Sequence, residues 1–383
     1  MHMDKFMFSY PTKVYFGEGS AKQALSAELG QVGPVVMLAY GGGSIKKNGI
    51  YDEVKELLAQ AGKTVVDFSG IMSNPTYVKV QEGVALVRAQ QVDFILAVGG
   101  GSVIDCSKVI AAQSVLDEDI WSMEYEKGKF PTTGIPMGAI VTASGTGAEM
   151  NAGGVITHEE KKWKGGIFGL APTFAVLDPA YTLSVPHLQV LSGAFDTLSH
   201  ALETYLGNSD QDNVSDDVAL AVMRNTVVNM RRLLKNMDDL QARSNLMWDS
   251  AMAENGILKC GRLTDFQVHQ IEHQLGAYTD CNHGQGLAMI QPIYCRHIVK
   301  DAPEKFARFA KLVLGADTAE AGIAALEQLI KDCGLPTRLS ELHSTVEITP
   351  ELLRQVADSS NLIKCNPRGF SHDEVYEILM ECL

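Results

Sequence analysis

The sequence predicts an α/β N-terminal domain followed by an all-α C-terminal domain. Up to about Pro186, short runs rich in Val, Ile, Leu and Phe end in glycine and precede helical patterns, as in stacked βαβ units around a parallel sheet. After Pro186 the strand signals stop and long segments with helical periodicity take over. We therefore expect one domain at residues 1–186 and a second at residues 187–383.

The expected strands are nearly continuous apolar runs, which suits a parallel sheet covered on both faces. Two of them, residues 34–40 and 93–98, are each followed by three glycines and a serine. Helical patterns cover residues 77–89 and 103–115. Further strands are expected at residues 63–68, 138–142 and 174–178.

The second half carries no strand signal of comparable strength. With no repeat and no long linker, we expect the two halves to pack closely around a ligand cleft. The helical patterns cover residues 188–206, 214–234, 240–255, 263–278, 304–314 and 318–333.

Composition excludes several functions. Of 383 residues, 32 are Lys or Arg and 46 are Asp or Glu, giving a net charge of −14, which is too acidic for a general nucleic-acid binder. No apolar run reaches the roughly 18 to 20 residues that span a bilayer, and the start lacks the pattern of a secretion signal. Seven scattered cysteines form no CxxC pair, so we expect reduced thiols and a cytoplasmic protein.

Two glycine loops are candidate phosphate sites. Bare backbone amides before a helix can approach a phosphate closely because glycine has no obstructing side chain. The alternative is that the glycines only allow positive φ in strand-end turns. Neither loop matches the G-x-G-x-x-G or GK[ST] patterns. The loops are Gly41-Gly42-Gly43-Ser44 and Gly99-Gly100-Gly101-Ser102.

The first loop also bears on the choice of cofactor. NAD-selective sites usually place an acidic side chain against the ribose 2′-hydroxyl. The segment from Tyr40 to Lys47 contains no acid but has Ser44, Lys46 and Lys47. A dinucleotide bound here is therefore expected to be NADP(H), unless both lysines merely face solvent.

A cluster of histidines and a carboxylate has metal-ligand spacing. Asp196 and His200 are four residues apart, which places them on one face of a helix, and His269 and His273 repeat that spacing. His283 follows an expected bend. Three imidazoles and one carboxylate suit Fe²⁺ or Zn²⁺ better than Mg²⁺ or Ca²⁺. Spacing alone does not choose between His269 and His273, and a helical histidine is often only a buried or surface residue.

Several motifs in fixed order resemble the iron-containing (group III) alcohol dehydrogenases. The similarity runs from residues 14–17 to residues 366–368. Within the family the chain is most similar to the NADPH-dependent butanol dehydrogenase and broad aldehyde reductase branch, through residues 40–47. The motifs are Gly99 to Asp105, Thr142 to Glu149, Asp196-x-x-x-His200, and His269-x-x-x-His273 with His283-Gly284.

The resemblance implies a dehydroquinate synthase-like architecture and a homodimer. It assigns the metal to Asp196, His200, His269 and His283, and places His273 near the nicotinamide as a candidate proton relay. Two departures, Asn282 for the family's frequent proline and Ala148 for its serine, touch no ligand. The further cofactor contacts that it implies are Ser102, Asp105, Thr142, Thr146, Asn151 and Lys164, with Lys162 as a substitute for Lys164.

The expected function is metal-dependent hydride transfer between NADP(H) and a primary alcohol or aldehyde such as butanol or butanal. The metal is expected to be Fe²⁺, with Zn²⁺ as the alternative. One alternative function is that of a zinc-dependent, NAD-using polyol dehydrogenase of the glycerol type. The other is a metal- or nucleotide-binding protein without turnover.

Overall fold

A computed structural model describes residues 5–207, 213–264, 266–364 and 367–383. The chain divides into two compact units, which we call the α/β unit (Tyr10–Val185) and the helical unit (Pro186–Leu383, joined by the N-terminal segment up to Ser9). The expected first domain therefore differs from the observed unit at its start, because residues 5–9 group with the helices. Phe8 lies close to the helical unit, since a Cβ at Gly256 would be 3.8 Å from its ring.

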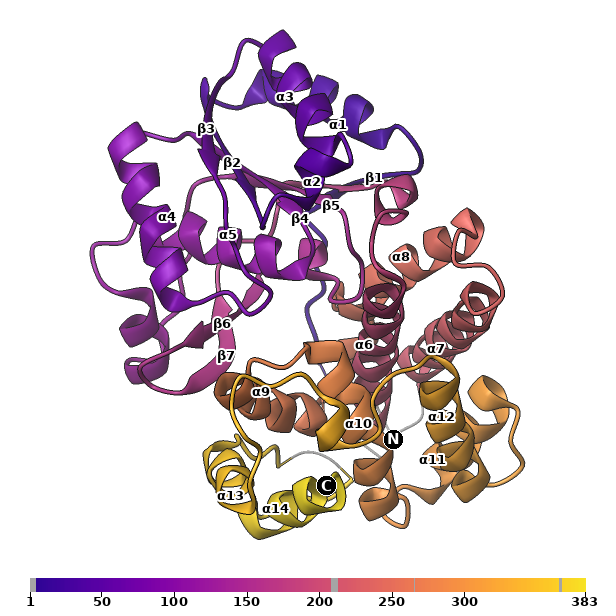
Figure 1. Ribbon diagram of the computed structural model, residues 1–383. Helices are drawn as coiled ribbons and strands as arrows, with labels where there is room; N and C mark the ends of the chain where they lie inside the picture. Colours follow the sequence, from indigo (N-terminus) through magenta and orange to yellow (C-terminus); the bar gives the residue numbers. More distant parts are fainter. Residues whose placement is uncertain (1–4, 208–212, 265, 365–366) are drawn as a thin grey trace. The chain divides into compact units, whose positions relative to one another are not determined.

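The α/β unit is built on a six-stranded parallel sheet (Figure 1). Its register pairs Leu38 with Leu96 and Leu96 with Gly138, and the central strands are buried on both faces. This confirms the reading of their apolar runs. In sheet order the strands are β1 (Lys13–Phe16), β8 (Phe174–Leu177), β5 (Met137–Val141), β4 (Phe94–Gly99), β2 (Val35–Tyr40) and β3 (Thr64–Phe68).

Helices follow the strands as the βαβ pattern requires. Residues of α1 (Ser20–Glu28) and α3 (Ile50–Gln60) share a hydrophobic core with β2 and β4. Helices α4 (Tyr77–Gln90) and α5 (Gly101–Gln113) pack on each other, and Gly83 leaves the room that the Ile110 side chain fills. Short helical segments complete the unit: Leu29–Gln31, α2 (Ser44–Lys47), Ser122–Glu126, Ala148–Met150 and Pro179–Thr182.

A two-stranded antiparallel hairpin, β6 (Gly153–His158) and β7 (Trp163–Phe168), stands apart from the main sheet. The sequence does not predict it, because its four glycines weaken the strand pattern. Gly154 is needed where β6 passes α5, since a Cβ there would meet the Asp105 carbonyl oxygen at 2.9 Å. The hairpin thus lies against the helix that follows the second glycine loop.

The helical unit confirms most of the expected helices and adds three. The pattern at residues 263–278 begins too early, because Phe266 has a left-handed backbone (φ 57°) and α9 starts after it. The sequence does not predict α10, because Gly284, Gly286 and Pro292 weaken its helical pattern. The helices are α6 (His187–Leu206), α7 (Val214–Leu233), α8 (Leu240–Glu254), Ile257–Lys259, α9 (Gln267–Thr279), α10 (His283–Ile298), α11 (Pro303–Phe309), Ala310–Leu314, α12 (Ala319–Asp332), Leu339–Glu341, α13 (Pro350–Ser359) and α14 (His372–Glu381).

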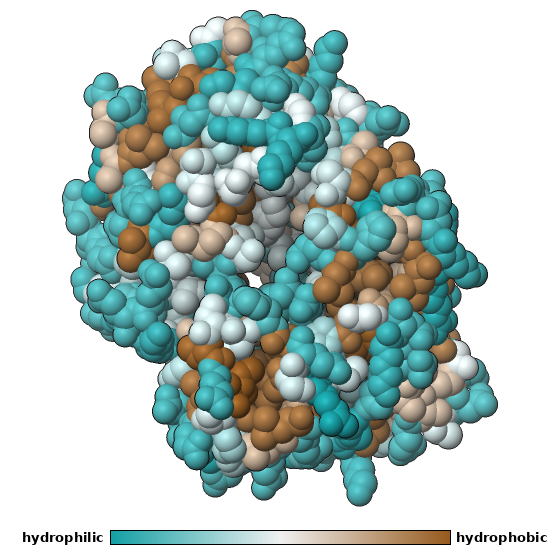
Figure 2. Space-filling view, viewed as in Figure 1, coloured by the Kyte–Doolittle hydropathy of each residue, from teal (hydrophilic) through white to brown (hydrophobic). Residues whose placement is uncertain are grey.

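The visible surface is mostly hydrophilic, with hydrophobic patches on both units (Figure 2). Among the described residues, no helix is both long and apolar enough to cross a bilayer. The six cysteines of the described part all carry free thiols.

Candidate metal centre and nucleotide site

Three helices of the helical unit carry the histidine and carboxylate cluster. Asp196 and His200 lie one turn apart on α6, His269 lies on α9, and His283 is the first residue of α10. The expected bend before His283 is present, because Asp280 ends α9 with a left-handed backbone (φ 56°). The Asn282 side chain then caps α10 by accepting the Gln285 amide proton.

Three imidazole nitrogens surround one carboxylate oxygen. His200 Nδ1 lies 3.3 Å from Asp196 Oδ1, and His269 Nε2 and His283 Nε2 each lie 3.6 Å from it. Four ligand atoms about 2.1 Å from a tetrahedral metal lie about 3.4 Å from one another. The spacing of these donors therefore matches a first-row metal site.

The chemistry of the donor atoms also fits a cation. Within the described part of the chain, Asp196 Oδ1, His200 Nδ1 and His269 Nε2 are buried and have no hydrogen-bond partner. Buried polar atoms normally have one, so three that converge without it indicate a ligand that satisfies them. Three nitrogens and one oxygen suit Fe²⁺ or Zn²⁺.

Glu203 is a buried carboxylate that the sequence interpretation missed. Its Oε1 lies 2.5 Å from His269 Nδ1, and its Oε2 accepts the backbone N–H of Val268 at 2.8 Å, at the start of α9. Glu203 fixes the imidazole so that Nε2 points to Asp196, as second carboxylates do in many metal sites. The available signal was its position, seven residues after Asp196 and three after His200, on the same helix face.

Glu272 does the same for His283. Its carboxylate is fully buried and bonds His283 Nδ1, which leaves Nε2 to face Asp196. Gly286 makes this approach possible, because a Cβ there would lie 2.8 Å from the Glu272 side chain. Glu272, His273 and His283 also form a compact group of potential donors, but the bond to His283 gives Glu272 an orienting role.

His273 lies beside the cluster. It follows His269 by one turn of α9, and its ring centroid is 6.1 Å from that of His269 and 5.4 Å from that of His283. The other three imidazoles, those of His200, His269 and His283, surround Asp196 Oδ1. The geometry supports His269 over His273 as a ligand, a choice that spacing left open.

The cluster stabilises positive charge at its centre. Burial raises the pKa of Asp196, but the neighbouring imidazoles outweigh burial and hold that pKa below its usual value. Burial lowers the pKa of His269, but Glu203 and Asp196 outweigh it and raise the pKa to about 10. These two carboxylates therefore favour positive charge at the position that a divalent cation would occupy.

The two glycine loops lie at a topological switch point of the α/β unit. Strands β2 and β4 are neighbours, yet the chain leaves β2 toward β3 and leaves β4 toward β5, on the other side. In open α/β sheets, ligands bind outside the carboxyl ends of the strands at such a point. Gly41 to Ser44 follows β2, and Gly99 to Ser102 follows β4 into α5.

The second glycine loop meets the loop that follows β5. A Cβ at Gly101 would lie 2.3 Å from Thr146 Oγ1, so only glycine fits there. The backbone N–H of Thr142 donates to the Gly99 carbonyl at 2.9 Å, while the Ser102 hydroxyl donates to the Ser73 carbonyl. These contacts bring the loop after β5 against the second glycine loop.

A buried lysine that the sequence interpretation missed organises two predicted cofactor contacts. Lys108 Nζ donates to Asn151 Oδ1 at 3.0 Å and to the Gly153 carbonyl at 2.6 Å, and lies 3.3 Å from Asp105 Oδ1. Asp105 Oδ2 accepts the Val155 N–H at 3.0 Å. In this structure Asp105 and Asn151 therefore tie α5 to β6.

The remaining predicted contacts differ in exposure. Ser44 and Lys47 are exposed on α2, and Lys46 lies over the rings of Tyr40 and Tyr51. Lys164 is buried within β7, whereas Lys162 is exposed in the hairpin turn with φ 51°.

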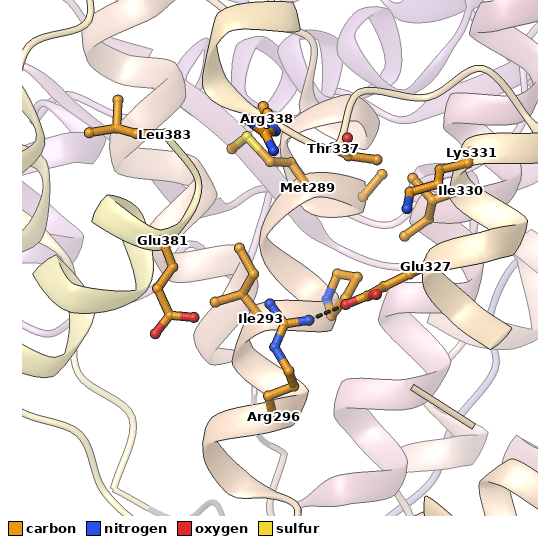
Figure 3. Close-up of a pocket in the computed structure, with 12 residues that line it drawn as sticks. Met289, Ile293, Arg296, Glu327, Ile330, Lys331, Thr337, Arg338, Glu381 and Leu383 are labelled. Carbon is orange, nitrogen blue, oxygen red and sulfur yellow. Dashed lines mark hydrogen bonds and ion pairs between the residues drawn. The ribbon is translucent and has the colours of Figure 1, made fainter. Parts of the chain in front are cut away.

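A separate cavity of about 420 Å³ lies elsewhere in the helical unit (Figure 3). Its lining residues Met289 and Arg296 follow His283 by six and thirteen positions, or about 9 and 20 Å along α10. An ion pair between Arg296 and Glu327 crosses it. None of the cluster residues lines this cavity.

Glycine loops at the switch point of a parallel sheet are typical of nucleotide-binding proteins, and a cluster of three histidines and one carboxylate is typical of metal-binding proteins. The family model for iron-containing alcohol dehydrogenase matches residues 11–179. The C-terminal model of the Fe-containing alcohol dehydrogenase family matches residues 190–383. The chain belongs to the iron-containing alcohol dehydrogenase family.

Named relatives agree over nearly the whole chain. The NADH-dependent butanol dehydrogenase A of Clostridium acetobutylicum is 36% identical over 98% of this chain and 99% of its own length. The NADPH-dependent aldehyde reductase YqhD of Escherichia coli is 34% identical over 93% of this chain and 94% of its own. The crystal structure of NADH-dependent butanol dehydrogenase A from Thermotoga maritima has a TM-score of 0.92 and 33% identity, covering 100% of this chain and 99% of that one.

These matches confirm the predicted family and the fold class, an α/β unit followed by a helical unit like those of the solved relatives. The protein is an oxidoreductase of the alcohol dehydrogenase and aldehyde reductase type, and its family implies a nicotinamide cofactor and iron. One of the named relatives is NADH-dependent and another is NADPH-dependent.

Proposed function

We propose that this enzyme transfers hydride between NADP(H) and a primary alcohol or aldehyde such as butanol or butanal. The observation that carries the proposal is the convergence of three imidazoles on Asp196, in a chain that also places two glycine loops at the switch point of a parallel sheet. Butanol, aldehyde and 1,3-propanediol occur in the names of relatives.

Asp196, His200, His269 and His283 would hold Fe²⁺, or Zn²⁺ in its place. When bound, the metal supplies a Lewis acid for a substrate oxygen. Glu203 and Glu272 keep two of these imidazoles oriented through their Nδ1 atoms. Because the donors come from three packed helices, the site is formed before substrate arrives.

The α/β unit would position the nicotinamide cofactor, which supplies or accepts the hydride. The N-terminus of α5 and the backbone amides of Gly99 to Ser102 suit the pyrophosphate. Thr142, Thr146, Asn151 and Lys164 would orient the rest of the cofactor. The bond from Lys108 of α5 to the Asn151 side chain and the bond from the Thr142 N–H to the Gly99 carbonyl support this arrangement for Asn151 and Thr142.

NADP(H) is favoured by the first loop. Ser44 and Lys47 are exposed beside Gly43, where a hydroxyl and an ammonium can bind a 2′-phosphate. No acid lies in the loop itself.

His273 is the proposed proton relay. An imidazole that titrates near neutral pH can give a proton to an alkoxide and take one from an alcohol. Its place beside His269 and His283, outside the set around Asp196, supports this role. A cytoplasmic location and a homodimer complete the proposal; the free thiols of the described cysteines suit the first, and light scattering tests the second.

The decisive assay follows NADPH oxidation with butanal on metal-stripped protein, before and after anaerobic addition of Fe²⁺. We expect activity only with the metal and a lower Michaelis constant for NADPH than for NADH. Activity with polyols and NAD alone would instead favour the glycerol-type dehydrogenase. No turnover with metal and nucleotide bound would favour a protein that binds both without catalysis.

Two variants test the assignment of histidines. His269→Ala should lose the metal, whereas His273→Ala should keep it and slow turnover, as measured by elemental analysis beside the rate. Equal loss of metal from both variants would contradict the assignment.

A further inference from the structure

An acidic side chain stands on the strand next to the first glycine loop. Asp67, near the end of β3, pairs with Leu38 of β2, and β2 leads directly into that loop. Asp67 follows Gly43 by 24 residues. In dinucleotide-binding folds, an acid about 20 residues beyond the glycines binds the ribose hydroxyls. The loop sequence contains no acid, but the fold brings one to its edge.

Both oxygens of this carboxylate are engaged by α3. The Tyr51 hydroxyl donates to Oδ1 at 2.9 Å, and Lys55 Nζ donates to Oδ2 at 3.1 Å. Tyr51 and Lys55 are four residues apart, so they share one face of the helix. The two bonds hold the carboxylate on the α3 side of the loop.

Lys46 completes the arrangement from α2. Its Nζ lies 5.0 Å from the Tyr40 ring centroid and 4.6 Å from that of Tyr51, within cation–π range. The two rings meet edge to face at 5.5 Å. We call Tyr40, Lys46, Tyr51, Lys55 and Asp67 the loop-edge cluster.

The loop-edge cluster contains two ammonium groups and one carboxylate. Partial burial raises the pKa of Asp67, but hydrogen bonds from Tyr51 and Lys55 and the charge of Lys55 outweigh burial and keep the pKa below its usual value. The Asp67 side chain is 37% exposed, so its charge reaches the surface beside the loop. Without a compensating ammonium, that charge would repel a phosphate bound nearby.

We propose that Lys55 and Asp67 together determine the choice between NADP(H) and NAD(H). Lys55 neutralises the acid that would otherwise repel a 2′-phosphate, so the phosphate is accepted at Ser44 and Lys47. Asp67 without Lys55 would act as the acid of an NAD-selective site and accept a hydrogen bond from a 2′-hydroxyl. The inference rests on the proposed function, because it requires the first loop to bind the adenosine end of the cofactor.

The test compares binding of 2′,5′-ADP and of ADP by calorimetry, which needs neither metal nor turnover. In Lys55→Met, the affinity for 2′,5′-ADP should fall about twofold to fivefold, the range of an exposed ion pair, while the affinity for ADP stays unchanged. In Asp67→Asn, 2′,5′-ADP should bind at least as well as in the wild type. In the double variant, the effect of Lys55→Met should disappear, because Lys55 acts through Asp67.

Lys13→Met is the matched control. Lys13 is exposed and forms an ion pair 3.0 Å from Glu28, a less exposed acid of the same unit, so its loss removes one surface charge without touching the loop-edge cluster. Its nucleotide preference should equal that of the wild type. If Lys13→Met changes the nucleotide preference as much as Lys55→Met does, the change in net charge explains both results and the inference is wrong.

Two further outcomes separate a failure of the inference from a failure of the proposed function. If Lys55→Met weakens 2′,5′-ADP equally with and without Asp67, Lys55 contacts the phosphate directly and the inference is wrong, while the proposed function stands. If the wild type binds neither nucleotide, the first loop is no adenosine site, and both the proposed function and the inference fail.

Discussion

At the scale of single residues, Glu203 joins the metal cluster to the backbone. One oxygen holds His269 Nδ1, and the other accepts the N–H of Val268 at the positive end of α9. The same carboxylate thus orients the His269 imidazole and bonds the first turn of the helix that carries it. A glutamine could accept the backbone proton but would no longer present a charged acceptor to the imidazole.

Glu203→Gln should therefore weaken metal binding more than it weakens the fold. We expect the dissociation constant for Zn²⁺ to rise about tenfold to a hundredfold, the usual cost of losing such a carboxylate. Titration against a competing chelator measures it. Asp249→Asn, which changes another buried carboxylate of the helical unit that bonds Asn225 and Thr226, is the control and should bind the metal normally.

At the scale of elements, Lys108 holds α5, the Asn151 turn and β6 together. Removing one member of a buried ion pair leaves the other charge uncompensated, at a cost of about 3–5 kcal/mol. Lys108→Met should lower the urea midpoint of the α/β unit and weaken dinucleotide binding. Adding Asp105→Asn should restore part of the stability, because the stranded carboxylate is then gone. A double variant less stable than Lys108→Met would contradict this account.

Glu124 forms a pH-dependent bond between the helical segment Ser122–Glu126 and β7. Its carboxylate accepts the Phe168 N–H with both oxygens, at 3.0 and 2.9 Å, and burial raises its pKa to about 7 although this bond opposes the shift. A glutamate with a raised pKa stabilises the fold fully below its ordinary pKa of 4.5 and loses that contribution as pH rises through about 7.

Glu124→Gln should remove this loss of folding stability at rising pH. As the pH rises from about 5 to about 8, the free energy of unfolding of the wild type should decrease by about 1–2 kcal/mol more than that of the variant. Thermal unfolding across this range measures the difference. Glu126→Gln, at an exposed neighbour, should keep the wild-type pH dependence, and an equal change in both variants would exclude Glu124 as the cause.

At the scale of the whole molecule, a metal held by α6, α9 and α10 would stabilise one unit selectively. Ligands that bind only the folded state stabilise it by mass action. Chelation should speed hydrogen exchange in these three helices and leave β2 and β4 unchanged, as mass spectrometry of the exchanged peptides would show. Equal acceleration in both units would mean that the metal lies elsewhere.

Much of the fold could be predicted from the sequence because its signals are local. The apolar runs ending in glycine gave β2 and β4, and helical periodicity gave α6 to α8 within a residue or two. The hairpin β6–β7 and α10 could not be predicted in this way, since glycine and proline weaken local propensity and only packing overrides it.

The sequence by itself determined the division near Pro186, the two glycine loops and a set of five candidate metal ligands, because strand ends and helical spacing follow from neighbours along the chain. Only the tertiary structure decided which imidazoles face Asp196, which carboxylates orient them, and that Asp67 lies beside the first loop. These relations join residues of different helices and strands. Their distances depend on packing and sheet order, which no local pattern encodes.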